Sequence, residues 1–146
     1  MKPFKLQAVL DHRQRLEDMA QQKLSQARMV EEALDEEHTT AQKQLNDLCI
    51  EYEQRQSKGM HSHEFMLYEN RIEHQRNHIT QLVWARKKAQ DFVHECREEL
   101  TGASRNKHLL AKLKEKNFAE QEQELKHKEM IELDEMTILR QFEEDL

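Results

Sequence analysis

The stretch that decides the fold reads Ser57-Lys58-Gly59-Met60-His61-Ser62-His63. It holds one of only two glycines among 146 residues, and it interrupts an otherwise continuous pattern of apolar positions. Glycine favours a chain reversal because it tolerates backbone angles that other residues avoid. We therefore expect a hairpin turn at residues 57–63, with one long element before it and one after it.

Both flanking stretches carry an apolar stripe at the spacing of a coiled coil. Before the turn, steps of seven give six apolar positions out of seven: Leu6, Arg13, Ala20, Ala27, Leu34, Ala41 and Leu48. After the turn, the same steps give Phe65, Ile72, Ile79, Arg86, Val93 and Leu100. Polar and charged residues occupy most positions between the stripes, as the solvent side of a helix requires. The stripes predict helices at about residues 4–56 and 64–140.

Two helices joined by a short loop must run antiparallel. A reversal at about residue 59 places Ala27 near Ala89 and Leu6 near Leu110. Because the first helix runs out near residue 4, pairing should stop near residue 113. Residues 115–146 then form a helical overhang with no partner inside the chain. The expected fold is all-α: a single domain, residues 1–146, built as an antiparallel coiled-coil hairpin with a C-terminal overhang.

Composition excludes several classes of function. The formal net charge is −6, with charges of both signs mixed along the chain, so nucleic acid is not expected as a partner. No stretch approaches the ~20 apolar residues of a membrane span, so direct membrane insertion is not expected either. The start of the chain does not resemble a signal peptide, which predicts a cytoplasmic protein. Cys49 and Cys96 form no C-x-x-C motif, which fits a reducing compartment.

The sequence carries no recognisable catalytic or cofactor motif. It lacks G-x-x-x-x-G-K-[ST], H-E-x-x-H and G-x-S-x-G, and two glycines cannot build a phosphate-binding loop. His74 and His78 stand at i and i+4, a spacing that can grip a metal, but nothing nearby completes a tetrahedral site. The many carboxylates fit a solvated helix face better than acid–base chemistry. We therefore expect no enzyme, no cofactor and no metal.

Two sets of apolar residues bear on partner binding. Trp84 falls between stripe positions, beside Leu82 and Val83, and we expect it to be a buried flank of the seam. An exposed tryptophan would instead mark a docking patch. The overhang also carries large apolar residues that would lack a partner in the chain, which predicts a partner outside it: Met130, Ile131, Leu133, Met136, Ile138, Leu139 and Phe142.

Three stretches resemble the FliJ family, the small coiled-coil stalk proteins of the flagellar type III export apparatus. The first is Phe4-Lys5-Leu6-Gln7-Ala8-Val9-Leu10-Asp11-His12-Arg13. The second is the turn with Gly59, followed by Tyr68-Glu69-Asn70-Arg71-Ile72. The third is Leu113-Lys114-Glu115-Lys116, followed by Leu133-Asp134-Glu135. The likeness covers nearly the whole chain, and it rests on the order and spacing of these stretches.

The resemblance implies a non-enzymatic function in the export of flagellar subunits. Family members look like the gamma-subunit stalk of rotary ATPases; they dock in the hexameric export ATPase and contact the cytoplasmic domain of the export-gate membrane protein. Export chaperones are a further implied partner, and the implied location is the inner face of the cell membrane. By this resemblance the ATPase-binding end comprises Phe4, Leu6, Leu10, Arg13, Leu113, Lys114, Lys116, Leu133, Asp134 and Glu135. The gate-binding face comprises Arg71, Gln75 and His78.

The same sequence pattern also fits other functions and assemblies. The chain could be the stalk of a virulence type III secretion system, which shares fold and partner class. It could also be a structural coiled coil that dimerises through the overhang, or a parallel dimer without a reversal. Gly59 and the break in the stripe argue against the parallel dimer, because a continuous parallel pair would not tolerate such a turn.

Overall fold

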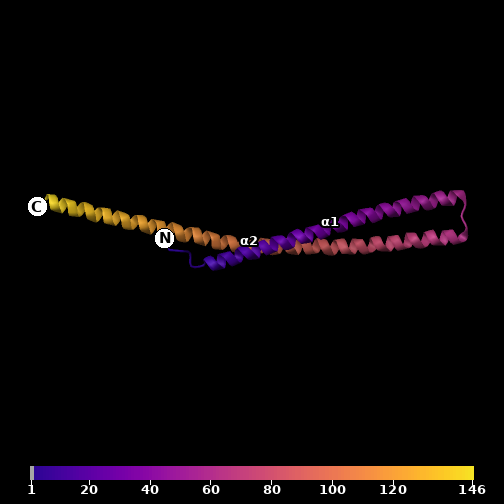
Figure 1. Ribbon diagram of the computed structural model, residues 1–146, viewed down its shortest axis with the longest axis horizontal. Coiled ribbons are helices and arrows are strands. Elements are labelled where there is room, and N and C mark those ends of the chain that lie inside the picture. Colours follow the sequence, from indigo (N-terminus) through magenta and orange to yellow (C-terminus); the bar gives the residue numbers. More distant parts are fainter. Residues whose placement is uncertain (1) are drawn as a thin grey trace. The chain divides into compact units, whose positions relative to one another are not determined.

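The computed structural model describes residues 2–146 and places nearly all of them in two helices (Figure 1). Helix α1 comprises Gln7–Lys58 and helix α2 comprises Ser62–Glu144. Among residues 2–146 there is no strand, and no helix has both the length and the apolar character that crossing a membrane requires. The expected all-α fold with two long, mutually packed helices is confirmed.

The connection between the helices occupies residues 59–61, a shorter span than the expected 57–63. Gly59 has a φ of 89°, a left-handed conformation that ends α1 without the steric cost a side chain would add. Its amide donates to the Gln56 carbonyl oxygen at 3.2 Å, which satisfies one of the last carbonyls of the helix. At the start of α2, Glu64 places a carboxylate in the first turn, where the helix dipole favours negative charge.

The chain divides into two compact units. Ala20–Leu100 forms one, here called the turn unit; the residues up to Met19 and Thr101–Leu146 form the other, here called the terminal unit. Within the turn unit α1 and α2 run antiparallel, and within the terminal unit the start of α1 lies beside α2 (Figure 1). Each unit therefore contains a piece of both helices.

The core of the turn unit is a thin seam of small and medium side chains. Leu24 and Ala27 of α1 pack with Val93 and Cys96 of α2, and Leu100 packs against this cluster. Cys96 is the most buried of them, with 1% of its surface exposed, as expected for a small residue of the seam. Alanine and cysteine let two helices approach closely, which suits a two-helix seam with water on both sides.

The register differs from the expected one. Ala27 packs with Val93 and Cys96, about one helical turn beyond Ala89, its expected neighbour. The observed connection is centred on Met60, whereas the expected pair of Ala27 with Ala89 places the centre of the reversal near residue 58. A heptad stripe alone does not distinguish registers one turn apart, since apolar layers follow one another along both helices.

Ion pairs across the seam are consistent with the observed register. In the turn unit, Lys23 Nζ lies 3.1 Å from Glu99 Oε2, and Arg86 Nε lies 2.6 Å from Asp35 Oδ1. The hydrogen bond to Glu99 and its negative charge raise the pKa of Lys23 above its ordinary value. Exposed pairs of this kind contribute little to stability, so their main effect is on register.

Aromatic side chains close the end of the turn unit beside the connection. The Tyr52 ring meets Phe65 edge-on at 5.9 Å between centroids and Tyr68 at 5.3 Å. The Tyr68 hydroxyl donates to Glu51 Oε1 at 3.0 Å, so its polar end is satisfied while the ring is buried. Such edge-to-face pairs favour one arrangement of the two helix ends.

Candidate partner-binding surfaces

The N-terminal segment extends the pairing in the terminal unit. Phe4 is buried, with 7% of its surface exposed, and its carbonyl accepts a hydrogen bond from the Gln7 amide at 3.1 Å. Lys2 lies beside Gln121 and Leu125 in a shared hollow. An extended chain advances up to about 3.3 Å per residue, whereas a helix advances about 1.5 Å per residue. The non-helical residues 2–6 therefore reach farther along α2 than the same residues would in a helix.

Helix α2 is half-buried at intervals as far as Gln121, about two turns beyond the point where pairing was expected to stop. The expectation stopped short for two reasons: it placed the register about two turns too early at this end, where Lys107 in fact pairs with Glu17, and it gave the first residues a helical rise. The family resemblance also implied that Phe4 belongs to a binding surface, whereas the structure packs the Phe4 side chain within the terminal unit. Phe4 therefore packs within this end of the terminal unit and presents little surface to solvent.

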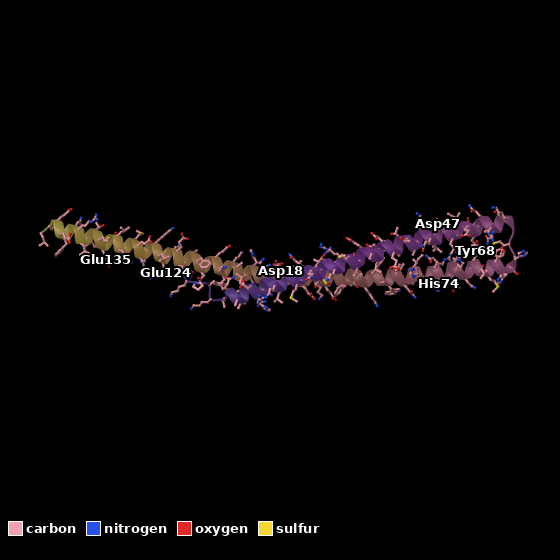
Figure 2. All side chains as sticks on the ribbon, in the orientation of Figure 1. Asp18, Asp47, Tyr68, His74, Glu124 and Glu135 are labelled. Carbon is pink, nitrogen blue, oxygen red and sulfur yellow. The ribbon has the colours of Figure 1, made fainter. Side chains whose placement is uncertain are left out.

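Residues 122–146, here called the unpaired segment, are exposed along their whole length. Figure 2 shows Glu124 and Glu135 on a stretch of α2 with no second helix beside it. Phe142 has 68% of its surface exposed, which is unusual for a side chain of this size. The other large exposed apolar side chains of this segment are Leu125, Met130, Ile131, Leu133, Met136, Ile138, Leu139 and Leu146.

Charge changes sign along α2 within the terminal unit. Residues 100–118 hold five basic side chains and one acidic one, whereas the unpaired segment holds nine acidic and three basic ones. Two of the five basic groups are engaged: Lys107 Nζ lies 3.3 Å from Glu17 Oε1, and Lys114 Nζ lies 5.7 Å from the centre of the Phe118 ring. The other three are exposed on the helix: Arg105, Lys112 and Lys116.

The ten residues expected at the ATPase-binding end do not form one cluster. Leu6, Leu113 and Lys116 are exposed, while Leu10, Arg13 and Lys114 are half-buried on the paired part. Leu133-Asp134-Glu135 is fully exposed on the unpaired segment, roughly 30 Å along the helix from Lys114. The terminal unit therefore offers a basic paired part followed by an acidic and apolar helix.

A groove of about 400 Å³ lies between the helices of the turn unit near the connection. Two of the three residues expected on the gate-binding face, Arg71 and Gln75, line it, and His78 does not. His74 lines it as well, and the sequence had indicated that residue only as part of a histidine pair. The remaining lining residues come from α1: Gln44, Asp47, Leu48 and Glu51.

The polar groups at this groove differ in availability. The Gln75 side-chain amide donates to the Ala41 carbonyl oxygen at 2.9 Å, so it is held by α1. Arg71 is exposed, and its guanidinium lies 5.6 Å from the centre of the Tyr68 ring. His78 Nε2 lies 4.0 Å from Glu37 Oε1 on another part of the seam. Arg71 is thus the member of the expected set best placed to meet an outside partner.

The expectation that Trp84 is buried is wrong. Its side chain has 63% of its surface exposed, and the neighbouring Val83 is exposed as well. Leu82 occupies the seam position and is buried, so Trp84, two residues on, points away from α1. Among residues 2–146 no group of three or more His, Cys, Asp or Glu side chains is arranged so that it could hold a metal ion.

Comparison with known proteins gives one match. Residues 1–144 match a family model described as "Flagellar FliJ protein". No curated protein and no solved structure matches at a significant level.

Proposed function

From the premise that this chain belongs to the FliJ family of flagellar proteins, we propose that it is a non-enzymatic component of flagellar protein export that binds the export ATPase hexamer through its terminal unit. The observation that carries the proposal is the unpaired segment, which is exposed throughout and helical as far as Glu144. A single helix in water gains little from its own hydrogen bonds, because most helical stability in proteins comes from packing one face. A binding partner would supply that packing.

The electrostatics of the terminal unit support a ring-shaped partner with two zones. The basic part of α2, with Arg105, Lys112 and Lys116, suits an acidic lining. The unpaired segment, with Leu133-Asp134-Glu135 at its middle, suits a basic and partly apolar lining. Six of the expected residues would hold the start of the chain against α2 while this end is inserted: Phe4, Leu6, Leu10, Arg13, Leu113 and Lys114.

The groove of the turn unit is the proposed site for the cytoplasmic domain of the export-gate protein. Arg71 and His74 present cationic and hydrogen-bonding groups at its edge, and Gln75 is held in place by Ala41. His78, on the neighbouring turn of α2, extends this face toward Glu37. Export chaperones are a further proposed partner class. The proposed location is the cytoplasm, at the inner face of the membrane where the export apparatus sits.

The test is ATP hydrolysis by the export ATPase of the same organism, measured with the full chain and with a chain stopped after Gln121. Stopping there keeps the residues beside Phe4 and removes the unpaired segment alone. The full chain should stimulate hydrolysis and increase the hexamer fraction, and the shortened chain should do neither while keeping its paired helices by circular dichroism. Full stimulation by the shortened chain would show that the unpaired segment is not the docking element.

A matched variant separates the two surfaces. Arg71→Ala alters the groove and leaves the terminal unit unchanged, so it should weaken binding to the gate domain and leave ATPase stimulation intact. A stalk of a virulence secretion system would share this fold, but the family that matches is the flagellar one. Self-association of the chain is supported by a separate observation, the pattern of exposed side chains along α2.

A further inference from the structure

One side of α2 in the terminal unit carries ten exposed side chains whose spacing is the same in both directions. Their separations are 4, 3, 4, 4, 7, 4, 4, 3 and 4 residues. Steps of three, four and seven keep positions on one side of a helix. The ten positions are Arg105, Leu109, Lys112, Lys116, Glu120, His127, Ile131, Glu135, Ile138 and Phe142, and we call them the symmetric stripe.

The symmetric stripe faces away from the start of α1. The residues of α2 that meet α1 and the N-terminal segment lie on other positions: Lys107 reaches Glu17, and Leu110, Lys114 and Phe118 are half-buried. By helical geometry Lys107 and Lys114 stand roughly opposite Arg105 and Lys112 around the helix. The stripe is therefore free of the pairing that the chain makes with itself.

The two halves of the stripe are chemically complementary. The first half carries three basic side chains, Arg105, Lys112 and Lys116, together with Leu109 and Glu120. The second half is mainly apolar, with Ile131, Ile138 and Phe142, and it also carries Glu135 and His127. The centre of symmetry falls between Gln123 and Glu124. A helix of this kind matches a copy of itself that runs in the opposite direction.

We propose that two copies of this chain associate through the symmetric stripe as an antiparallel dimer. The register places Lys112 opposite the partner's Glu135, Leu109 opposite the partner's Ile138, and Arg105 opposite the partner's Phe142. Each contact occurs twice, because a two-fold interface uses the same surface on both copies. These three of the five pairs are an ion pair, an apolar pair and a cation over an aromatic ring. The other two set Lys116 opposite the partner's Ile131 and Glu120 opposite the partner's His127.

The charges select the antiparallel direction. A parallel pair would set Lys112 against the partner's Lys112 and Glu135 against the partner's Glu135, and like charges at close range repel. Within residues 100–118 basic side chains outnumber acidic ones by five to one, and within the unpaired segment acidic ones outnumber basic ones by nine to three. Antiparallel association therefore brings each basic part next to an acidic part.

The dimer does not depend on the proposed function, but it bears on it. The stripe runs through the unpaired segment, so a dimer covers three of its apolar residues, Ile131, Ile138 and Phe142, which a ring would otherwise contact. Self-association and docking then compete for one surface, and the dimer is a storage form of the free protein. Dilution or a ring of higher affinity would release it.

Sedimentation equilibrium of the full chain over a wide concentration range tests the dimer. The chain should pass from monomer to dimer with concentration, and higher salt should shift the midpoint upward because the ion pairs are exposed. Lys112→Glu and Glu135→Lys should each raise the Kd about tenfold, since each turns two attractive pairs into two repulsive ones. The double variant Lys112→Glu with Glu135→Lys should restore the original Kd. Failure of the charge swap to restore association would overturn the register.

A matched control distinguishes a specific pair from a general charge effect. Glu129→Lys changes the net charge as much as Glu135→Lys but lies on the other side of α2, so it should leave the Kd unchanged. An equal loss in both variants would overturn the proposal, as would a chain that stays monomeric at every concentration. Far-UV circular dichroism of each variant confirms that the helices are intact.

Crosslinking tests the direction independently. In a chain with Cys49→Ser and Cys96→Ala, the double substitution Leu109→Cys with Ile138→Cys should give a disulfide between position 109 of one copy and position 138 of the other. The two positions are roughly 40 Å apart within one helix, so the bond cannot form inside a chain. Mass spectrometry of the crosslinked peptide reports the pair. A bond between the two copies of position 109 would overturn the antiparallel arrangement.

Discussion

Truncation of Leu24 is expected to cost the turn unit much of its stability. Leu24 has 6% of its surface exposed and packs in the cluster of Ala27, Val93 and Cys96. Buried leucine-to-alanine changes cost about 2–5 kcal/mol. The seam is one layer deep, so water and neighbouring side chains can partly fill the space, which places Leu24→Ala near the lower end, at about 2–3 kcal/mol. For a chain of this length that corresponds to a fall of about 5–10 °C in Tm.

Met29→Ala is the control for this experiment. Met29 lies on the same helix but has 66% of its surface exposed, so its truncation should change stability by less than about 0.5 kcal/mol. Both variants would be unfolded in urea and followed by far-UV circular dichroism, at a concentration low enough to keep the chain monomeric. Equal losses in the two variants, or a loss below about 1 kcal/mol for Leu24→Ala, would refute the placement of the core.

Three further predictions concern single positions. Phe4→Ala should increase amide exchange and proteolysis in the first ten residues and around Gln121, with little change in the turn unit, because Phe4 is buried only in the terminal unit; limited proteolysis with mass spectrometry reads this out. Gly59→Ala should destabilise the chain by about 1 kcal/mol through its positive φ, whereas Gly102→Ala should stabilise it by about 0.5–1 kcal/mol, since Gly102 is inside α2 with no atom within 4 Å of an added methyl group; urea unfolding compares them. Glu99→Gln should lower the pKa of Lys23 toward its ordinary value, as followed by NMR of the side-chain nitrogen; because the folded pKa is raised, the contribution of this pair to stability is present below the unfolded lysine pKa and is lost as pH rises through the folded one.

The sequence was sufficient to predict that two long helices would pack against each other. The heptad spacing depends on local geometry that every residue of the stripe shares, so a few errors at positions such as Arg13 do not obscure it. Gly59 was identifiable because the chain has so few glycines. These features are repeated or rare, and both kinds can be read without knowing any long-range contact.

The register and the end of the pairing could not be predicted in the same way. Both Ala89 and Val93 are apolar and fit beside Ala27, and the choice between them depends on where the reversal is centred and on pairs such as Lys23 with Glu99. The position of Phe4 along α2 depends on whether residues 2–6 are helical or extended. Pro3 alone does not decide between these two conformations. Trp84 was misjudged because one aromatic residue off the stripe fits a flank as well as an outer face.

The residues expected to bind partners are brought together by the structure only in part. Arg71 and Gln75 line one groove, yet His78 lies outside it, because His78 is on the same side of α2 but about one turn farther along the helix than Gln75. The symmetric spacing between Arg105 and Phe142 was present in the sequence from the start. It gains meaning only when the structure shows that all ten positions are exposed.

The hydrogen bonds between the two helices have a further consequence for the order of folding. The bond from Tyr68 to Glu51 joins residues 17 apart in the chain, that from Arg86 to Asp35 joins residues 51 apart, and that from Lys107 to Glu17 joins residues 90 apart. Closing a long loop costs more entropy than closing a short one, unless the shorter loops inside it are already closed. The hairpin should therefore zip from Gly59 outward, and it should open again in the reverse sequence. The segment around Phe4 and the part of α2 beside it are the last to pair and the first to separate. Thermal opening would therefore begin at the end of the chain that we assign to the ATPase.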